Sequence, residues 1–507
     1  MREVSALLDG FIQLLHPFHF MMLLLAVAIG FIGGAMPGIS GAMLVVILLP
    51  ITYGMETTPV FLLLTGIYAA SVFSGMISAV LFRTPGTPEA IATTFDGYPM
   101  AKKGHPEKAL GLAIVSSVIG GIVGTVFLIG LTPILADFAL RFSSPEYFAL
   151  AVLGLTVVAS LSGGDLVKGL IGVLFGLFVA TIGIDVMTGA NRFTFHSTTL
   201  MSGIDFVPIL IGLFAISEVL RKSREESKAK GKMKKLSKSL LDLPMLRKVS
   251  TTLGRSSIIG VFVGILPGVG ATTASLLSYS EAVRWSKHPE TFGTGTPEGI
   301  AAPESANNSA AMGAMVPLLA LGIPGSATTA VILGAFVLHG LQPGPMLFDN
   351  EMEMVYSIFA GLIVVNLLIL FLAKPFIKLF SYTVKIPYSV LGPYIVVLCV
   401  IGTFAVRNSM FDVMIMLIFG LLGFGLEKIR FPIATIILGV VLGGMVEEQF
   451  RRSLVAANGD ISIFFTRPIS AVLLALALLA LVFPIVKKAF NRKDQKTITN
   501  NNGRHSL

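Results

Sequence analysis

The stretch GILPGVGATT, residues 264–273, places a Pro-Gly pair inside an apolar run that is long enough to be embedded in a membrane. A similar stretch, GAMPGISG, occupies residues 34–41 in another such run. Proline removes a backbone donor and clashes with the preceding turn, and glycine weakens the helix that remains. We therefore expect a helix break at Pro267-Gly268 and another at Pro37-Gly38.

A second Pro-Gly break follows in each half of the chain, in RTPGTPE at 83–89 and in GIPGSATT at 322–329. The order of first break, apolar span and second break is thus the same in both halves. Irregular backbone at membrane depth is tolerated only where it is buried in protein or lines a watery cavity. Matching breaks in two halves indicate the substrate site of a secondary transporter.

Composition predicts an all-α polytopic membrane protein. Of the 507 residues, 54% are hydrophobic and 13% are charged, whereas soluble proteins carry about 25% charged residues. Apolar runs near the roughly 20 residues that span a bilayer recur along most of the chain. We expect about 12 transmembrane helices together with re-entrant pieces, in a protein whose surroundings are the lipid bilayer.

The formal net charge of +9 comes mostly from one basic segment, residues 221–255. Because basic loops stay in the cytoplasm, membrane orientation explains this charge better than nucleic-acid binding, and no nucleic-acid partner is expected. The predicted domains are a first transmembrane repeat at 1–220, a basic cytoplasmic linker at 221–255, a second transmembrane repeat at 256–486 and a cytoplasmic tail at 487–507.

Other chemistries find little support in the sequence. Cys399 is the single cysteine, so neither an internal disulfide nor a Cys-rich metal site is expected. The chain lacks the Gly-x-x-x-x-Gly-Lys-[Ser/Thr] phosphate loop, so we expect no use of ATP through that motif. Glu3 and Asp9 interrupt the N-terminal segment, which does not look like a cleavable signal. We predict a protein that is not an enzyme and that needs no cofactor beyond a coupling ion.

The loop charges indicate that the two halves are inverted in the membrane. The loop after the second break is basic at 102–108, and its counterpart at 349–353 is acidic. The loop between the breaks carries Glu56 without Lys or Arg in the first half, but Arg284 and Lys287 in the second. The positive-inside rule therefore places equivalent loops on opposite sides.

Inversion makes residues 256–283 a re-entrant hairpin with Pro267-Gly268 at its tip. The arms on either side of the tip have about ten residues each, which is too short to span a bilayer. By the same argument residues 19–53 form a hairpin from the opposite face. Two kinked ordinary helices are the alternative interpretation.

The chemistry of the breaks suits an anionic solute and a cation. Broken helices expose N–H groups, which favour a carboxylate, and carbonyl groups, which favour Na⁺. The residues expected to bind substrate are Ser40, Thr87, Thr272, Thr273, Asn307, Asn308, Ser326 and Thr328. The residues expected to form the breaks or bind the ion are Pro37, Gly38, Pro85, Gly86, Pro267, Gly268, Glu304, Pro324 and Gly325. The alternatives are back-bonding to helix carbonyls for any one hydroxyl group and helix capping for Glu304.

Two other functions are alternatives. GISG at 38–41 resembles the serine motif of rhomboid intramembrane proteases, whose chemistry needs a histidine base on a neighbouring span. His196 and His339 are the nearest candidates, but both lie in loop-like or span-end sequence. A solute channel would need a continuous polar pore, whereas the repeated breaks favour alternating access.

The motifs at the breaks resemble those of a known family. The hairpin with Ser40-Gly41, TPGTP at 84–88, EGIAAPESANN at 298–308 and LGIPG at 321–325 look like the large membrane subunit of the tripartite tricarboxylate transporter family. The resemblance covers nearly the whole chain, and the combination of motifs is specific although each Pro-Gly pair alone is weak.

This resemblance implies a multi-pass permease of the bacterial inner membrane that works with a small membrane subunit and a periplasmic solute-binding protein. It also implies symport of a carboxylate-type solute with Na⁺ or H⁺, and citrate is the namesake of the family. The wider superfamily is similar to elevator-type transporters with inverted repeats and two hairpins, in agreement with the loop charges.

Overall fold

The computed structural model describes residues 2–161, 165–185, 187–223, 243–383 and 388–482. The chain forms two compact units, which are described separately. Unit 1 comprises Met1–Arg141 and Asp205–Gly425, and unit 2 comprises Phe142–Ile204 and Leu426–Leu507. The predicted tail and residues 224–242 of the predicted linker lie outside the described residues. The domain limits at 220, 255 and 486 stay predictions.

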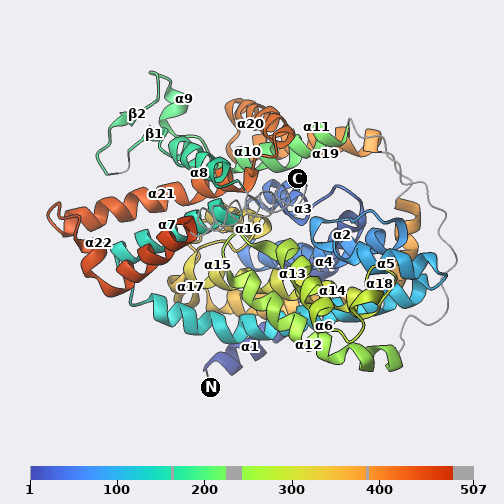
Figure 1. The fold of residues 1–507 in the computed structure, drawn as a ribbon. Coiled ribbons are helices and arrows are strands. Elements are labelled where there is room, and N and C mark those ends of the chain that lie inside the picture. The colour runs from blue at the N-terminus through green and yellow to red at the C-terminus, as the bar shows by residue number, and fades with distance from the viewer. Residues whose placement is uncertain (1, 162–164, 186, 224–242, 384–387, 483–507) are drawn as a thin grey trace, which may run out of the picture. The chain divides into compact units, whose positions relative to one another are not determined.

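Unit 1 consists of helices joined by turns and loops (Figure 1). Its first helices are α1 (Arg2–Gln13), α2 (Pro17–Ala35), α3 (Gly41–Leu48), η1 (Leu49–Thr52), α4 (Thr57–Phe82), η2 (Pro88–Ala90), α5 (Thr93–Lys102) and α6 (Pro106–Ala139). Three short pieces come next, α10 (Phe206–Leu210), η3 (Ile211–Ile216) and α11 (Ser217–Lys222).

The second half of unit 1 is again helical. Its elements are α12 (Leu243–Ile265), α13 (Gly270–Trp285), η4 (Pro289–Thr291), α14 (Glu298–Gly313), α15 (Met315–Leu321), α16 (Ala327–Leu338), α17 (Pro345–Asn350), α18 (Met352–Thr383), α19 (Tyr388–Arg407) and α20 (Met410–Lys428), whose last three residues belong to unit 2. Helix α12 begins at Leu243, inside the segment expected to be linker. The helical arm before Pro267 is therefore longer than the roughly ten residues on which the hairpin prediction rests.

The all-α polytopic fold is confirmed. In the described part of the chain, seven helices are long and apolar enough to cross a membrane, namely α2, α4, α6, α18, α19, α20 and α21 (Ile433–Ala456). Five shorter apolar helices accompany them. Fewer helices reach spanning length than the roughly 12 expected at about 20 residues per span, because the breaks divide several apolar runs into shorter pieces.

Helix α4 is the central span of unit 1. Its most apolar window is 100% buried inside the protein, and a helix that is apolar all round belongs in a core. Helices α2, α6, α14 and α18 all pack against it. Small residues on α4, such as Ser71 and Gly75, leave room for the backbone of its neighbours.

The breaks of the first half pack tightly on α4. A methyl group at Gly34 would come within 2.4 Å of the Ser71 carbonyl oxygen. A methyl group at Gly86 would lie 2.2 Å from the Gly34 carbonyl oxygen and 3.0 Å from Gly75 Cα. The first and second breaks of this half are therefore in direct contact through backbone atoms.

The second half repeats this packing on α14. A methyl group at Gly264 would come within 2.2 Å of the Ala310 carbonyl oxygen, and one at Gly325 would lie 2.8 Å from both the Gly264 carbonyl oxygen and Ala314 Cα. Gly34 and Gly264 each stand three residues before the proline of a first break. The two halves thus share one arrangement, while their inverted orientation stays a prediction.

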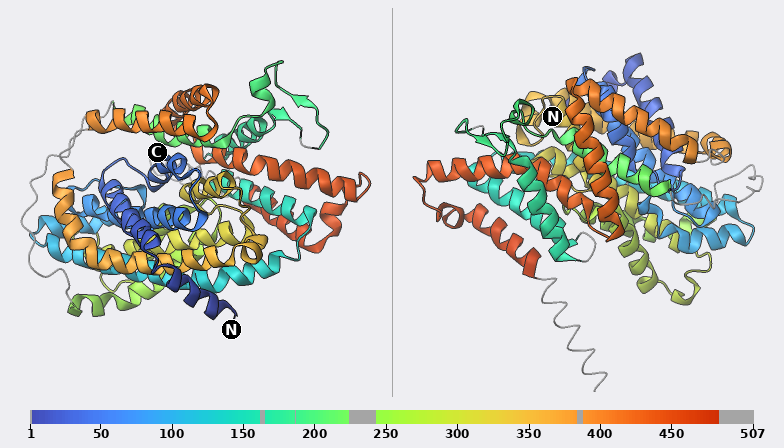
Figure 2. Two further views of the ribbon diagram at one scale, coloured as in Figure 1. Left: turned by 180° about the vertical axis from the view of Figure 1, so that it is seen from behind. Right: turned by 90° about the horizontal axis from the view of Figure 1, so that it is seen from above.

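Unit 2 contains further helices and a small hairpin (Figure 2). Its elements are α7 (Ser144–Leu161), α8 (Leu166–Ala180), β1 (Gly183–Ile184), β2 (Asn191–Arg192), α9 (Thr198–Met201), α21, α22 (Ile463–Thr466) and an apolar helix at Pro468–Val482. Helix α21 packs along α7 and α8. The contact with α8 is close because a methyl group at Gly176 would come within 2.2 Å of the Ile436 carbonyl oxygen.

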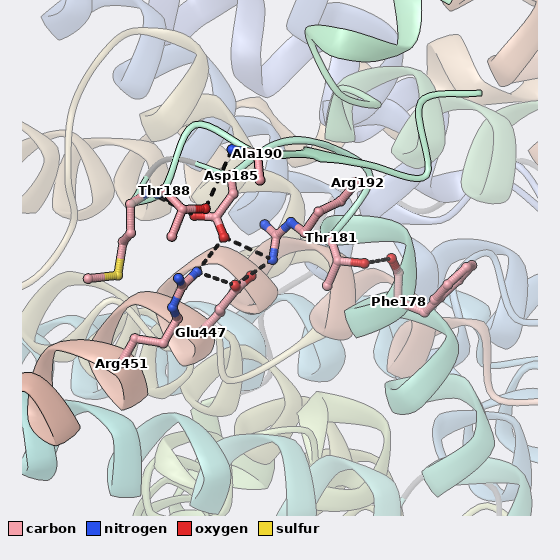
Figure 3. A network of polar contacts seen from close by, with 9 residues as sticks. Phe178, Thr181, Asp185, Thr188, Ala190, Arg192, Glu447 and Arg451 are labelled. Atoms are coloured by element: carbon pink, nitrogen blue, oxygen red, sulfur yellow. Dashed lines mark hydrogen bonds and ion pairs between the residues drawn. The ribbon is translucent and has the colours of Figure 1, made fainter. Parts of the chain in front are cut away.

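A four-residue ionic network fastens the hairpin of unit 2 to α21 (Figure 3). Arg451 Nη1 donates to Asp185 Oδ2 at 2.6 Å and to Glu447 Oε1 at 3.0 Å. Arg192 Nη1 also donates to Glu447 Oε1, at 2.5 Å. Asp185 Oδ1 accepts the Met187 backbone N–H at 2.8 Å. Two acids and two arginines therefore balance each other at the base of the hairpin.

Candidate substrate and ion site at the helix breaks

The first break of the first half separates α2 from α3. Helix α2 ends at Ala35, Gly38 takes a φ of 91° that favours glycine, and α3 begins at Gly41. Ser40 caps α3, because its Oγ accepts the Met43 backbone N–H at 3.2 Å. The helix therefore breaks at Pro37-Gly38, as the proline and glycine require.

The second break of the first half folds back onto α4. The helix ends at Phe82, and Arg83 takes a left-handed conformation with φ of 58°. Pro85 and Gly86 follow, and the Gly86 backbone N–H donates to the Gly75 carbonyl oxygen at 3.0 Å. Thr87 then lies against Gly75, since a methyl group at Gly75 would come within 2.4 Å of Thr87 Oγ1.

The two breaks of the second half meet each other. Helix α12 ends at Ile265, and the Gly268 backbone N–H, next to Pro267, donates to the Gly325 carbonyl oxygen at 3.0 Å. The second break follows α15, which ends in a left-handed glycine, and contains Pro324-Gly325. Ser326 caps α16 in a reciprocal capping box with Thr329.

Each half also reaches across to the second break of the other half. Tyr68 Oη on α4 lies 3.2 Å from Ser326 Oγ. Asn307 Nδ2 on α14 donates to the Glu89 carbonyl oxygen at 3.2 Å. Tyr68 stands seven residues before Gly75, and Asn307 stands seven before Ala314, which takes the place of Gly75 in the second half. These two contacts are therefore equivalent by position.

The first breaks adjoin these contacts as well, and we call the four breaks together with α4 and α14 the crossing. Helix α3 packs against α16, and α13 packs against η2, so each first break adjoins the second break of the other half. A methyl group at Gly41 would lie 2.6 Å from Ser71 Oγ and 3.7 Å from Thr328 Oγ1. All four breaks thus gather around α4 and α14, and Thr328 is buried there.

Glu304 lies inside α14 rather than at its mouth. The residue is 0% exposed, and its two carboxylate oxygens accept hydrogen bonds from the Thr93 and Ser117 hydroxyl groups. Helix capping, the alternative interpretation of Glu304, does not hold at this position. Asn308 Nδ2 donates to the Glu304 carbonyl oxygen at 3.0 Å and to Asn307 Oδ1 at 2.7 Å, which orients the Asn307 amide.

Among the described residues, Ser326 is the one predicted hydroxyl residue that makes a crosswise hydrogen bond. Thr273 on α13 is exposed, and Thr272 is half-buried. In the described part of the chain, no hydrogen bond joins either of them to another break. Ser40 likewise makes no hydrogen bond to a histidine there, and its hydroxyl group serves as the cap of α3. His339, a candidate base for the protease alternative, instead contacts Thr52 Oγ1 through Nε2 at 3.2 Å.

Two residues of the crossing, Tyr68 and Glu89, are not predicted from the sequence. Tyr68 is 2% exposed in the middle of an apolar span, where aromatic residues ordinarily serve packing. Its signal is its spacing, which matches that of Asn307 once the two spans are aligned on their breaks. Glu89 stands three residues after Gly86, and its acidic side chain is the signal there.

The chain matches the model of the tripartite tricarboxylate transporter TctA family over residues 20–438. An uncharacterized 52.8 kDa protein in the TAR-I ttuC' 3'region of Agrobacterium vitis is 38% identical over 492 residues, which cover 97% of this chain and 98% of that protein. An uncharacterized protein in the TAR-II ttuC' 3'region of the same organism is 40% identical over 236 residues, covering 46% of this chain and 98% of the relative. No solved structure shows significant similarity. The chain therefore belongs to the tripartite tricarboxylate transporter TctA family.

Proposed function

We propose that this protein is the large permease subunit of a binding-protein-dependent secondary transporter that imports a carboxylate-type solute with a Na⁺ or H⁺ gradient. The observation that carries this proposal is the pair of crosswise contacts, Tyr68 with Ser326 and Asn307 with Glu89. They join the second break of each half to the central span of the other half. A site shared by two repeats is the usual arrangement in secondary transporters.

The residues of the crossing suit a solute with carboxylate groups. Helix α16 has 12 residues, and the backbone N–H groups of its first turn favour negative charge. The Asn307 amide and the Thr328 hydroxyl group add neutral donors. Neutral donors bind an anion without the strong charge pairing that would hinder its release. The substrate is thus proposed to bind between α14 and the start of α16.

The family supplies the proposed partners and location. A tripartite transporter has a small membrane subunit and a periplasmic solute-binding protein beside its large subunit, so we propose both as partners of this chain. The proposed location is the bacterial inner membrane. Substrate and coupling ion would be carried as cargo, and no cofactor is proposed.

Reconstitution tests this function. The large subunit, its small membrane partner and its loaded binding protein are placed in proteoliposomes and supplied with a mixture of carboxylates. Uptake is measured with an imposed Na⁺ gradient and, separately, with only a pH gradient, and internal solutes are identified by mass spectrometry. We expect one carboxylate to accumulate under one gradient and to show saturable counterflow.

Two results would contradict the proposal. Equilibration of the solute without accumulation, and without counterflow, would indicate a channel. The absence of entry under either gradient, with the binding protein loaded and docked, would count against carboxylate import.

A further inference from the structure

Two buried oxygen atoms at the second break of the first half lack a hydrogen-bond partner among the described residues. They are Thr87 Oγ1 and Glu89 Oε2, and neither makes a hydrogen bond of ordinary distance and angle, although the Thr87 hydroxyl group lies near the Glu89 carboxylate. Thr87 is 1% exposed as a whole residue. Because an unpaired buried polar group is costly, such atoms in a native protein call for an explanation such as a bound ion.

The equivalent position in the second half is fully paired. Ser326 follows Gly325 as Thr87 follows Gly86. Ser326 Oγ accepts the Thr329 backbone N–H at 3.2 Å, and the Ser326 backbone N–H donates to Thr329 Oγ1 at 2.7 Å. Thr87 makes no such cap on η2. The two second breaks occupy equivalent positions but differ in chemistry, and of these two the first-half break is the one that carries an acidic side chain.

Backbone oxygens are also free at this break. The carbonyl groups of Thr84, Pro85 and Gly86 accept no hydrogen bond from the residues that the structure describes. Gly86 is buried, and its neighbour Thr87 supplies the unpaired hydroxyl group. The break thus presents a carboxylate, a hydroxyl group and carbonyl oxygens, which are the ligand types that hard cations take.

We propose that Thr87 and Glu89 form the binding site of the coupling cation, and that this cation is Na⁺. A cation satisfies the hydroxyl and carboxylate oxygens together, because both then act as electron-pair donors. Glu89 supplies the one carboxylate of the break at residues 83–89, and in the described residues no group of three or more His, Cys, Asp or Glu side chains could hold a metal ion. A single negative charge with neutral oxygens suits a monovalent ion better than a divalent one.

The position of the site links ion binding to the substrate. Asn307, a proposed substrate ligand, donates to the carbonyl oxygen of Glu89 itself. A cation that fixes Glu89 therefore also fixes the acceptor that orients Asn307. The role of Na⁺ as coupling ion rests on the proposed transport function, but the binding of Na⁺ to this site is measurable without transport.

The test is binding of ²²Na⁺ to the purified full-length protein in detergent, with no substrate present. We expect saturable binding to the native protein and at least about tenfold weaker binding, equivalent to about 1.4 kcal/mol, in both Glu89→Gln and Thr87→Val. Glu89→Gln keeps the backbone carbonyl that Asn307 uses. The matched controls are Glu290→Gln, an exposed acid, and Thr94→Val, whose hydroxyl group donates to the Ile91 carbonyl oxygen.

A second measurement guards against misfolded variants. NaCl, compared with choline chloride, should raise the thermal unfolding midpoint of the native protein and of both controls, and should not raise that of Glu89→Gln. Native binding in Glu89→Gln would overturn the site. Absence of ²²Na⁺ binding to the native protein would also overturn it, and accumulation of solute under a pH gradient alone would then leave the proposed transport function standing.

Discussion

At the scale of single residues, Asn307 has the most constrained role in the crossing. Its amide nitrogen donates to Glu89 of the other half, and its side-chain oxygen accepts from Asn308. Because the donor and acceptor ends of the amide have different partners, only one orientation of the side chain satisfies both. Its amide is therefore fixed in one orientation, as the proposed role of substrate ligand requires, and its loss should affect transport more than folding.

We predict that Asn307→Ala lowers solute uptake by about tenfold or more, since a hydrogen bond to a charged ligand contributes about 1.5–3 kcal/mol and roughly 1.4 kcal/mol is tenfold in rate. Uptake into proteoliposomes measures this, with equal protein insertion checked by immunoblot. Ser309→Ala is the control on the same helix, because Ser309 Oγ donates to the Ala306 carbonyl oxygen of α14 itself. Native uptake by Asn307→Ala would contradict the proposed site.

Asp185 provides a second prediction at this scale, in unit 2. The hydrogen bond from Arg451, followed by that from the Met187 backbone, lowers the pKa of Asp185 below its usual value. The folded hairpin thus favours the ionised carboxylate. Its contribution to stability is present above the usual pKa of about 3.9 and is lost as the pH falls toward the lowered value.

We therefore expect the amides of the hairpin to lose protection from hydrogen exchange when the pH falls below about 4. Mass spectrometry of the peptides that carry β1 and β2 measures this after correction for the intrinsic exchange rate. Asp185→Asn should show weakened protection already at neutral pH and a smaller further loss on acidification. An equal loss in native protein and variant would mean that another group is responsible.

At the scale of elements, close backbone contact keeps the breaks in place. Gly264 on α12 faces the Ala310 carbonyl oxygen of α14, and a methyl group would lie 2.2 Å away. Backbone atoms cannot move aside as a flexible side chain can. We predict that Gly264→Ala destabilises the protein by roughly 1–3 kcal/mol, the usual cost of overpacking.

Thermal unfolding in detergent measures this change. Gly130→Ala on α6 is the matched control, because nothing lies within 4 Å of a methyl group there and alanine favours a helix more than glycine. The control should unfold at or above the native temperature. Equal midpoints for Gly264→Ala and native protein would show that α12 moves away from α14 without cost.

The breaks were predictable from sequence and their partners were not. Pro37, Pro85, Pro267 and Pro324 determine where a helix must end through local backbone chemistry, and the structure ends helices there. The crosswise contacts join residues 258 and 218 positions apart in the chain, and local rules do not reach so far. Glu304 illustrates the same limit, since its two oxygens are paired by residues of α5 and α6.

At the scale of the whole molecule, unit 1 combines two halves of similar packing, and their orientation in the bilayer decides how access can alternate. An inverted pair would bring the two hairpins from opposite faces. The second breaks would then meet near the midplane, where Tyr68 and Asn307 contact them. A parallel pair would place both first breaks on the same face and could not alternate access in the same way.

Cysteine accessibility decides between these orientations. In a Cys399→Ser background, single cysteines replace His105, Arg284, Glu56 and Asp349, which are all exposed. A membrane-impermeant maleimide should label positions 105 and 284 from the cytoplasmic side and positions 56 and 349 from the periplasmic side, because basic loops stay inside. Labelling of positions 56 and 284 from one side would rule out inversion. The crossing would then be formed by parallel repeats, and the proposed substrate and cation would have to reach it through the same face.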